Sequence, residues 1–177
     1  MIYKSDELEN AALLDCAQAM AAAARTAPKA KGIDNTVTLV LTGEDKDKLA
    51  DEMEKYDEAV NGPSRSFITR DANCVRKSGA VILIGFKKFY YGLNCGYCGK
   101  ASCEEAKAAN VCCCFGTIDL GIAVGSAVST AQDMKVDSRV MFTIGKVAAT
   151  LKYVDDDVLF LGIPLSVSGK SPFFDRK

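Results

Sequence analysis

Three short runs of apolar and β-branched residues alternate along the chain with longer stretches that carry a helical repeat. The runs are TVTLVLT at 36–42, AVILIGF at 80–86 and VLFLGIP at 158–164. A nearly continuous apolar run of this length is typical of a strand that is buried on both faces of a sheet. The sequence therefore predicts three buried strands.

Helices are predicted between these runs. Residues 6–25 are rich in Ala and Leu, with Ser5 as the expected N-cap and Pro28 just beyond the end. In residues 43–62 the apolar positions recur every three or four residues, which is the spacing of one helical face. That face consists of Leu49, Met53, Tyr56 and Val60. Strands that alternate with helices indicate an α/β or α+β layered sheet.

A third helix, predicted for residues 117–134, has a flat face. Gly121, Gly125 and Ser129 are four residues apart, so they lie on the same side of the helix and permit the close approach of another helix. Two interpretations remain open from the sequence alone. The face packs against a helix of the same subunit, or it forms the interface of a homodimer.

The composition narrows the function classes. The chain has 177 residues, of which 49% are hydrophobic, which predicts a single domain over residues 1–177 with a sizeable core. Lys and Arg total 22 against 23 Asp and Glu, so nothing suggests the basic patch that a nucleic-acid-binding protein needs. There is no His, which excludes His-dependent catalytic triads and His-containing metal sites. Any metal must be held by Cys, carboxylate or backbone groups.

The expected location is the cytoplasm. The N-terminal stretch is acidic and amphipathic, and it lacks the basic start and apolar core of a signal peptide. The longest apolar stretch, 118–131, contains Asp119 and several Gly and Ser residues, so we expect it to be too short and too polar to span a bilayer. Disulfides are uncommon in a reducing compartment, and clustered cysteines there point to metal or redox chemistry.

Six of the eight cysteines lie within residues 93–116, LNCGYCGKASCEEAKAANVCCCFG. Cys95 and Cys98 form a CxxC pair, Cys103 follows five residues later, and the remaining three cysteines are consecutive at Cys112, Cys113 and Cys114. A CxxC turn points two thiolates at one centre, and further cysteines from a nearby element complete a tetrahedral set. Glycines directly after the first two cysteines permit the unusual dihedral angles of a loop that wraps a cluster.

A helix is predicted to begin inside this segment. Ser102 and Glu105 have the spacing of a capping box, which places Cys103 at the first helical position. The positive end of the helix dipole there favours a thiolate. Four thiolates can hold zinc or an iron–sulfur cluster. Three close cysteines and a distant fourth resemble ferredoxin-type ligation more than the paired knuckles of a zinc site. A [4Fe–4S] cluster is therefore preferred, with zinc as the alternative. Cys16 and Cys74 are expected to be buried and not ligands.

Several separated motifs resemble one family. CGYCGKASCEEAKAAN, CCCFGTIDLGIAVGSAVSTAQDMKVDSRVMFTIGKVAATL and LGIPLSVSGKSPFFDR occur here in the order found in uncharacterised prokaryotic proteins that are described as containing a ferredoxin domain. In that family the fourth cysteine lies two positions before a Phe, which corresponds here to Phe115. The resemblance thus implies Cys95, Cys98, Cys103 and Cys113 as ligands, with Cys112 or Cys114 as the alternative fourth ligand.

A wider similarity is to the FMN-dependent nitroreductase fold. It rests on ARTAPKAKGIDN, on the helix from Asp119 and on LGIP. It implies a three-layer α+β sandwich with helices around a mostly antiparallel or mixed sheet, a homodimer, and FMN between the subunits. The flavin contacts implied are Thr26, Pro28, Lys29 and Lys31. The arginine-rich segment that opens such enzymes has no counterpart, and Gly32 stands where they carry an Asn.

Two functions follow from these observations. The first is a cytoplasmic iron–sulfur redox protein that passes electrons between a [4Fe–4S] cluster and a partner protein, a small-molecule acceptor or a flavin site. The second is a structural or regulatory module in which zinc or a cluster has no catalytic role. For an enzyme, proton transfer would fall to Lys, Asp, Tyr or Cys, because there is no His. The sequence names no catalytic residue.

Overall fold

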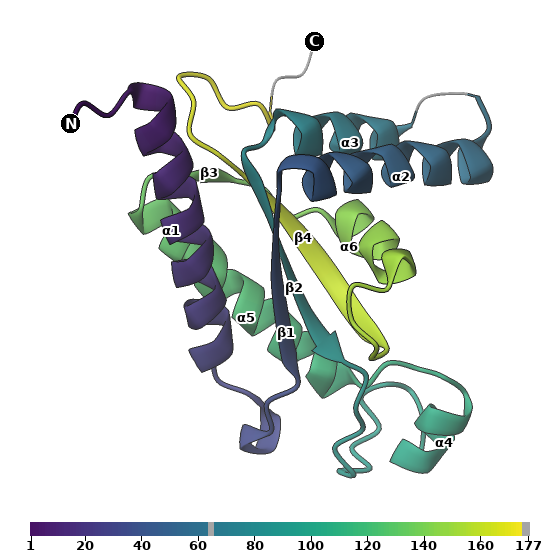
Figure 1. The fold of residues 1–177 in the computed structure, drawn as a ribbon. Coiled ribbons are helices and arrows are strands. Elements are labelled where there is room, and N and C mark those ends of the chain that lie inside the picture. The colour runs from purple at the N-terminus through teal and green to yellow at the C-terminus, as the bar shows by residue number, and fades with distance from the viewer. Residues whose placement is uncertain (64–65, 175–177) are drawn as a thin grey trace.

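A four-stranded antiparallel sheet forms the centre of the molecule. The computed structural model describes residues 1–63 and 66–174. The strands are β1 (Thr36–Thr42), β2 (Ala80–Lys87), β3 (Asp137–Ser138) and β4 (Val158–Ser166), and they lie in the order β1-β2-β4-β3. The two long strands β2 and β4 pair along their whole length, from Ala80 opposite Leu165 to Lys87 opposite Val158. They form the axis on which both helical layers pack (Figure 1).

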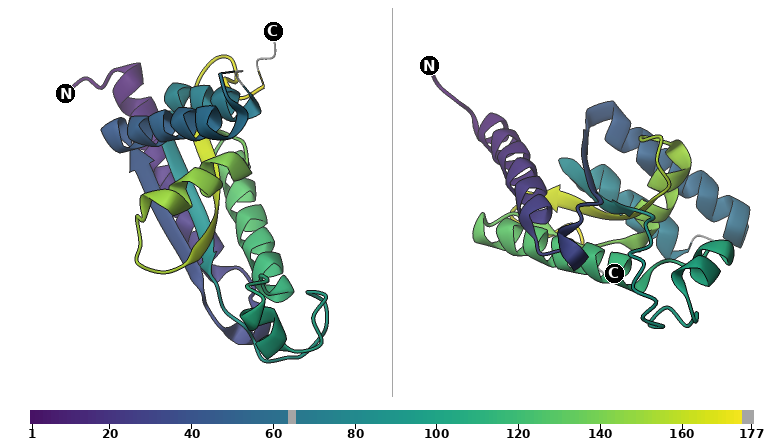
Figure 2. Two further views of the ribbon diagram at one scale, coloured as in Figure 1. Left: turned by 90° about the vertical axis from the view of Figure 1, so that its right-hand side faces the viewer. Right: turned by 90° about the horizontal axis from the view of Figure 1, so that it is seen from below.

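Helices cover both faces of the sheet. On one face lie α1 (Ser5–Thr26) and α5 (Cys114–Asp133), and on the other lie α2 (Gly43–Asn61), α3 (Phe67–Lys77) and α6 (Phe142–Ala148) (Figure 2). Two separate hydrophobic cores result. Ile82 and Ile84 face the layer of α1 and α5, whereas Val81 and Leu83 face the other helices. The fold is therefore the predicted three-layer α+β sandwich.

The predicted strands are present, but their burial differs. β2 is buried at every position except its last, as the apolar run predicted. β1 has the same character in sequence, yet only Leu41 is buried, because β1 is the edge of the sheet and pairs with β2 alone. The prediction that residues 36–42 are buried on both faces was wrong. A short apolar run does not show whether a strand has one neighbour or two.

The helix predictions need two corrections. Ser5 is not the N-cap of α1: that position is Lys4, whose backbone N–H donates to Glu7 Oε2 at 3.1 Å. The apolar stripe of α2 holds only in part, because Leu49 and Met53 are fully buried whereas Val60 is 59% exposed at the end of the helix. The sequence analysis assigned no helix to α3, which begins where the Ser66 hydroxyl accepts a hydrogen bond from the backbone of Ile68 at 3.0 Å.

The helix α5 is longer than expected, with 20 residues. Its length and apolar composition alone would suffice to cross a membrane, which corrects the expectation that this stretch is too short and too polar. In this fold one face of α5 belongs to the core, where Leu120, Ala123 and Ala127 pack with residues of α1 and β2.

The flat face of α5 points away from this core. A Cβ atom built at Gly121 or Gly125 would meet no atom within 4 Å. Ile118 and Ile122 flank these glycines and are 43% and 41% exposed. The interpretation that the glycines permit close packing inside the subunit is therefore wrong, and the homodimer interpretation stays a prediction.

Candidate metal centre

The cysteine-rich segment lies beyond one end of the sheet. It joins the end of β2 to the start of α5 and contains the short helix α4 (Cys103–Ala108), as Figure 1 shows. Its two ends lie close together, because a Cβ atom at Gly116 of α5 would overlap the ring of Phe86 in β2. The segment is thus a long loop whose two ends, at Phe86 of β2 and Gly116 of α5, lie in contact with each other.

The helix α4 begins as the sequence predicted. The Ser102 hydroxyl accepts a hydrogen bond from the backbone N–H of Glu105 at 3.1 Å, and Cys103 is the first helical residue. The Glu105 carboxylate accepts from the backbone of Ala101 at 2.9 Å, one residue earlier than in a regular capping box. This cap fixes Cys103 next to the free N–H groups of a helix start.

The CxxC loop is held against this helix start by Asn94. The Asn94 side-chain oxygen accepts a hydrogen bond from the backbone N–H of Cys103 at 2.8 Å. In return, the Asn94 backbone N–H donates to the sulfur of Cys103 at 3.4 Å. Gly96 and Gly99 adopt φ angles of +76° and +79°, which supports the predicted reason for glycine after each cysteine. The sequence analysis missed Asn94, which itself has a φ of +47°.

The three consecutive cysteines lie at the start of α5. Cys113 is the residue that precedes the helix and is buried, whereas Cys112 and Cys114 on either side are partly exposed. The ring of Tyr97 stacks on that of Phe115 with centroids 5.9 Å apart and planes 20° apart. Because Tyr97 lies between Cys95 and Cys98, this stack holds the CxxC loop against the first turn of α5.

All of the cysteines are free thiols, and the six of the segment gather at one end of the molecule. Within residues 1–63 and 66–174, however, no three Cys, Asp or Glu side chains lie close enough together to hold one metal ion. The donor chemistry therefore fits a thiolate-ligated metal, while the side chains do not form a closed ligand set. Cys16 and Cys74 are buried as predicted, and burial raises the pKa of both thiols.

A buried carboxylate connects this segment to the rest of the fold. Asp119 of α5 accepts a hydrogen bond from the Tyr91 hydroxyl at 2.6 Å and another from the backbone N–H of Ala30 at 3.0 Å. Burial, followed by the hydrogen bond and the negative charge of Asp119, raises the pKa of Tyr91 to about 12. Tyr91 is thus a neutral hydrogen-bond donor that ties the segment to α5, not a proton carrier near pH 7.

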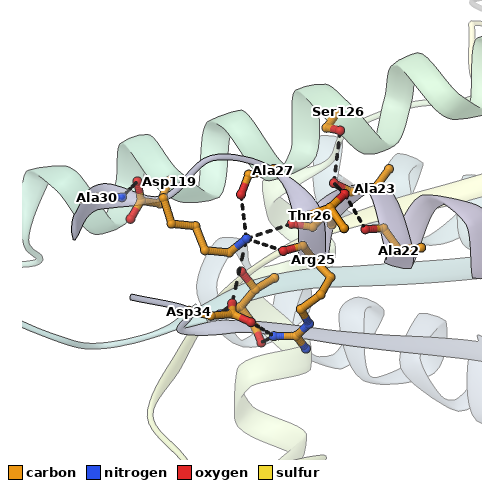
Figure 3. Close-up of polar contacts among 12 residues, drawn as sticks. Ala22, Ala23, Arg25, Thr26, Ala27, Ala30, Asp34, Asp119 and Ser126 are labelled. Carbon is orange, nitrogen blue, oxygen red and sulfur yellow. Dashed lines mark hydrogen bonds and ion pairs between the residues drawn. The ribbon is translucent and has the colours of Figure 1, made fainter. Parts of the chain in front are cut away.

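The residues predicted to contact flavin surround the end of α1. The Lys29 ammonium group donates to the carbonyl oxygens of Arg25 at 2.5 Å and Ala27 at 2.8 Å. These two acceptors are labelled in Figure 3. The Lys29 side chain is only 8% exposed. The Thr26 hydroxyl donates to the carbonyl of Ala22 at 3.0 Å. These carbonyls are among those that a helix end leaves without partners. Lys29 therefore serves as a buried C-terminal cap of α1.

Lys31 connects the same loop to the cysteine-rich segment. It lies in the short 3-10 turn Ala30–Gly32 with a φ of +55°, and its ammonium group donates to the Tyr91 carbonyl at 3.2 Å. Pro28 occupies the turn between α1 and this element. The Lys29 ammonium group is surrounded by internal acceptors, so a flavin contact would require it to exchange a partner. Lys31 is exposed and has one internal acceptor for its three N–H donors, and the Thr26 hydroxyl can still accept a hydrogen bond, so both could contact a flavin in this arrangement.

Comparison with known proteins decides the family. Residues 109–176 match the model of a family described as "Uncharacterized protein containing a ferredoxin domain". A relative from Archaeoglobus fulgidus is 43% identical over 185 residues, and the match spans 99% of this chain and 98% of the relative. The chain belongs to this family. The ferredoxin-domain resemblance that the cysteine motifs carry is thereby confirmed.

Solved structures confirm the nitroreductase-like fold. A BluB-like flavoprotein from Clostridium difficile 630 has a TM-score of 0.60 at 19% identity, over 88% of this chain and 81% of that one. A putative nitroreductase from Desulfovibrio desulfuricans in complex with FMN has a TM-score of 0.58 at 15% identity, over 92% and 78%. At these identities the similarity establishes the three-layer fold alone.

The capping role of Lys29 predicts a loss of stability on substitution. Lys29→Met should lower the free energy of unfolding by about 0.5–1.5 kcal/mol, because it removes the donor to the partly buried carbonyl oxygens at the end of α1. Urea unfolding of flavin-free protein measures this effect, with the exposed Lys48→Met variant as control. Unchanged stability of Lys29→Met would contradict the capping role and favour a side chain that is free for a ligand.

The contact between Tyr91 and Asp119 predicts a pH dependence. The pKa of Tyr91 is about 12 in the fold and about 10 in an unfolded chain. Because the fold favours the neutral phenol, this stabilisation is complete below pH 10 and is lost as the pH rises toward 12. Ultraviolet titration of the tyrosines should show a transition near pH 12 that disappears in Tyr91→Phe and moves toward pH 10 in Asp119→Asn. The transition of Tyr153, whose pKa burial also raises, should stay unchanged in both variants. A Tyr91 transition near pH 10 in the unmodified chain would contradict the buried hydrogen bond.

Proposed function

We propose that this chain is a cytoplasmic iron–sulfur redox protein whose cysteine-rich segment holds one [4Fe–4S] cluster. The observation that carries this proposal is the Asn94–Cys103 contact inside a family described as containing a ferredoxin domain. A backbone N–H that already points at a cysteine sulfur is the kind of contact that stabilises a bound thiolate and tunes a cluster's potential.

Cys95, Cys98, Cys103 and Cys113 are the proposed ligands. The bound cluster would supply one-electron chemistry, and the chain's own residues would hold and shield it. Asn94 positions the first helical cysteine, the glycines allow the loop to curve, and the Tyr97–Phe115 stack keeps the loop beside α5. The proposal requires the thiol side chains to converge when iron binds, because they do not form a closed set among the described residues.

The fourth ligand is proposed as Cys113 in preference to its neighbours. Cys113 is the most buried cysteine of the segment. Cys112 and Cys114 are both partly exposed. Burial of a ligand keeps water from the cluster, which favours Cys113 over Cys112 or Cys114.

The electron partner is proposed to be a small-molecule acceptor or a redox protein. FMN is a further candidate, since the Desulfovibrio desulfuricans protein of the same fold is in complex with FMN. The internal acceptors of Lys29 argue against a flavin contact by that side chain as it stands, whereas Thr26 and Lys31 keep hydrogen-bonding capacity for one. Zinc in the cysteine-rich segment is the alternative, and it would make the chain a structural or regulatory module.

A homodimer is also proposed, with α5 at its centre. The outer face of α5 exposes two isoleucines beside glycines that leave the helix surface flat. An exposed apolar face of this kind, on a helix whose other side is part of the core, is typical of an interface with a partner helix.

The cluster predicts a defined metal content. Protein purified without oxygen should contain about four irons and four acid-labile sulfides per chain, the composition of a [4Fe–4S] cluster. Iron, sulfide, zinc and flavin assays on one sample, with an absorption spectrum, measure this content. Cys113→Ala should lose the cluster, while Cys112→Ala and Cys114→Ala should keep it.

Cys74→Ala is the matched control, because this buried cysteine lies outside the segment and should leave the iron content unchanged. A colourless protein with about one zinc per chain would replace the redox proposal by the structural module. Loss of iron in Cys112→Ala or Cys114→Ala, but not in Cys113→Ala, would reassign the fourth ligand.

The dimer predicts a change in molecular mass. Light scattering should give twice the 18.9 kDa mass of one chain. Ile122→Glu should return the mass to that of a monomer, because it places a carboxylate at the centre of the α5 face. Val60→Glu, at an exposed valine far from α5 in the sequence, is the control and should stay dimeric. A monomeric unmodified chain would refute the dimer.

A further inference from the structure

Asp119 of α5 is a buried carboxylate that has hydrogen-bond donors but no cation as a partner. It accepts hydrogen bonds from the Tyr91 hydroxyl at 2.6 Å and from the backbone N–H of Ala30 at 3.0 Å, and Figure 3 shows the second of these. Over residues 1–63 and 66–174, no ion pair includes this carboxylate. Burying a charge is costly unless it is paired or hydrogen-bonded. The two donors therefore stabilise Asp119, while its negative charge stays uncompensated.

The lysines of the loop after α1 do not neutralise this charge. Lys29 lines the same small hollow as Asp119. Its ammonium group is bound by carbonyl oxygens at the end of α1, and its ion pair is with Asp34. Lys31 donates to the Tyr91 carbonyl and is exposed, so water and salt screen its charge. Asp119 thus places a fixed negative charge in this part of the fold.

This charge lies near the start of α5, where the fourth cluster ligand is proposed. Asp119 follows Cys113 by six residues in sequence, which corresponds to ~9 Å along the helix axis. Tyr91, the donor to Asp119, belongs to the cysteine-rich segment itself. Its pKa is raised first by burial and next by the hydrogen bond to Asp119, and the negative charges of Asp119 and Cys113 add to the rise. The phenol therefore lies in the electric field of both groups.

The surroundings of Asp119 are apolar, so its charge is weakly screened. Phe86 and Leu120 line the same hollow, and both are buried residues of the core. The effective dielectric constant between buried groups is far below that of water. At a distance of ~10–12 Å and an effective dielectric constant of ~20, one unit charge changes an equilibrium constant for adding an electron about tenfold.

The sign of this effect is opposite to that of the N–H donors in the segment. The backbone N–H of Asn94 points at the Cys103 sulfur, and such a donor stabilises added negative charge, which raises a cluster's reduction potential. A fixed carboxylate repels an added electron and lowers the potential. The segment and α5 thus carry groups that act in both directions.

We propose that the negative charge of Asp119 lowers the reduction potential of the cluster held by the cysteine-rich segment, and so makes this chain an electron donor. Asp119 acts across the intervening core, and Tyr91 and Ala30 hold it in place. The inference rests on the proposed function, because it concerns the same cluster. It adds the direction of electron flow, and it narrows the partner to a one-electron acceptor of higher potential.

The test is a redox titration of the anaerobically purified holoprotein with dithionite, followed by visible absorption. Asp119→Asn removes the charge and keeps the shape. Its amide oxygen can accept from Ala30, and its NH₂ group can donate to the Tyr91 hydroxyl oxygen. Reduction should become about tenfold more favourable, which is about 59 mV for a one-electron couple. Asp119→Ser is a second, smaller neutral variant and should shift the potential in the same direction.

Asp133→Asn is the charge-matched control. Asp133 is the exposed last residue of α5, and the helical rise places it ~30 Å along the axis from Cys113. Its removal should leave the potential unchanged. Ionic strength gives a second readout, because salt screens exposed charges much more than buried ones. The difference between the unmodified protein and Asp119→Asn should be the same at low and high salt, and a difference that vanishes at high salt would overturn the proposal.

Iron and sulfide are assayed on every sample, so that the failures can be told apart. Equal potentials in the unmodified protein and the neutral variants, with the cluster present in all, would refute the role of Asp119 and keep the cluster. Loss of iron from both neutral variants would overturn the tuning role, because Asp119 would then only hold the segment in place. An unmodified protein without iron would refute the proposed function, and this inference with it.

Discussion

The buried carboxylate of Asp119 is the contact on which the arrangement around the candidate centre depends. It lies one turn and a half into α5 and receives hydrogen bonds from Tyr91, in the cysteine-rich segment, and from Ala30, in the loop after α1. Burying a carboxylate is costly unless its oxygens have donors. The cost of leaving Asp119 without partners therefore helps to hold both loops in place, together with aromatic contacts such as the Tyr97–Phe115 stack.

Local signals made parts of this structure predictable. The Ser102–Glu105 spacing located the start of α4 to the residue, because a capping box is set by neighbours three positions apart. The strand cores were equally clear, since β2 and β4 are apolar without interruption. The edge position of β1 was not predictable, because it depends on which strands pair, and that is set by contacts distant in sequence.

The sequence predicted the cysteine thiols of the candidate site, but not the residues that hold their loops in position. The six cysteines of the segment were evident from the sequence. The Asn94–Cys103 and Tyr91–Asp119 contacts were not, because the partners of each pair meet only in the folded chain. For Lys29, in contrast, the sequence suggested a contact that the structure does not show. Its position in a motif suggested a ligand contact, but the nearby end of α1 supplies carbonyl oxygens that occupy its ammonium group. A sequence motif can therefore indicate where a residue lies, but its contacts depend on the neighbouring groups in the folded chain.

The two ends of the cysteine-rich segment lie next to each other, and this bears on how the segment can vary among related proteins. Phe86 at the end of β2 and Gly116 in the first turn of α5 are in contact, so the intervening residues form a loop whose two ends are already joined by the core. The entropy of closing such a loop grows only slowly with its length. A segment of another length could therefore replace this one without disturbing the sheet. The cysteine-rich loop can thus change in length and sequence while the sheet and its helices stay the same.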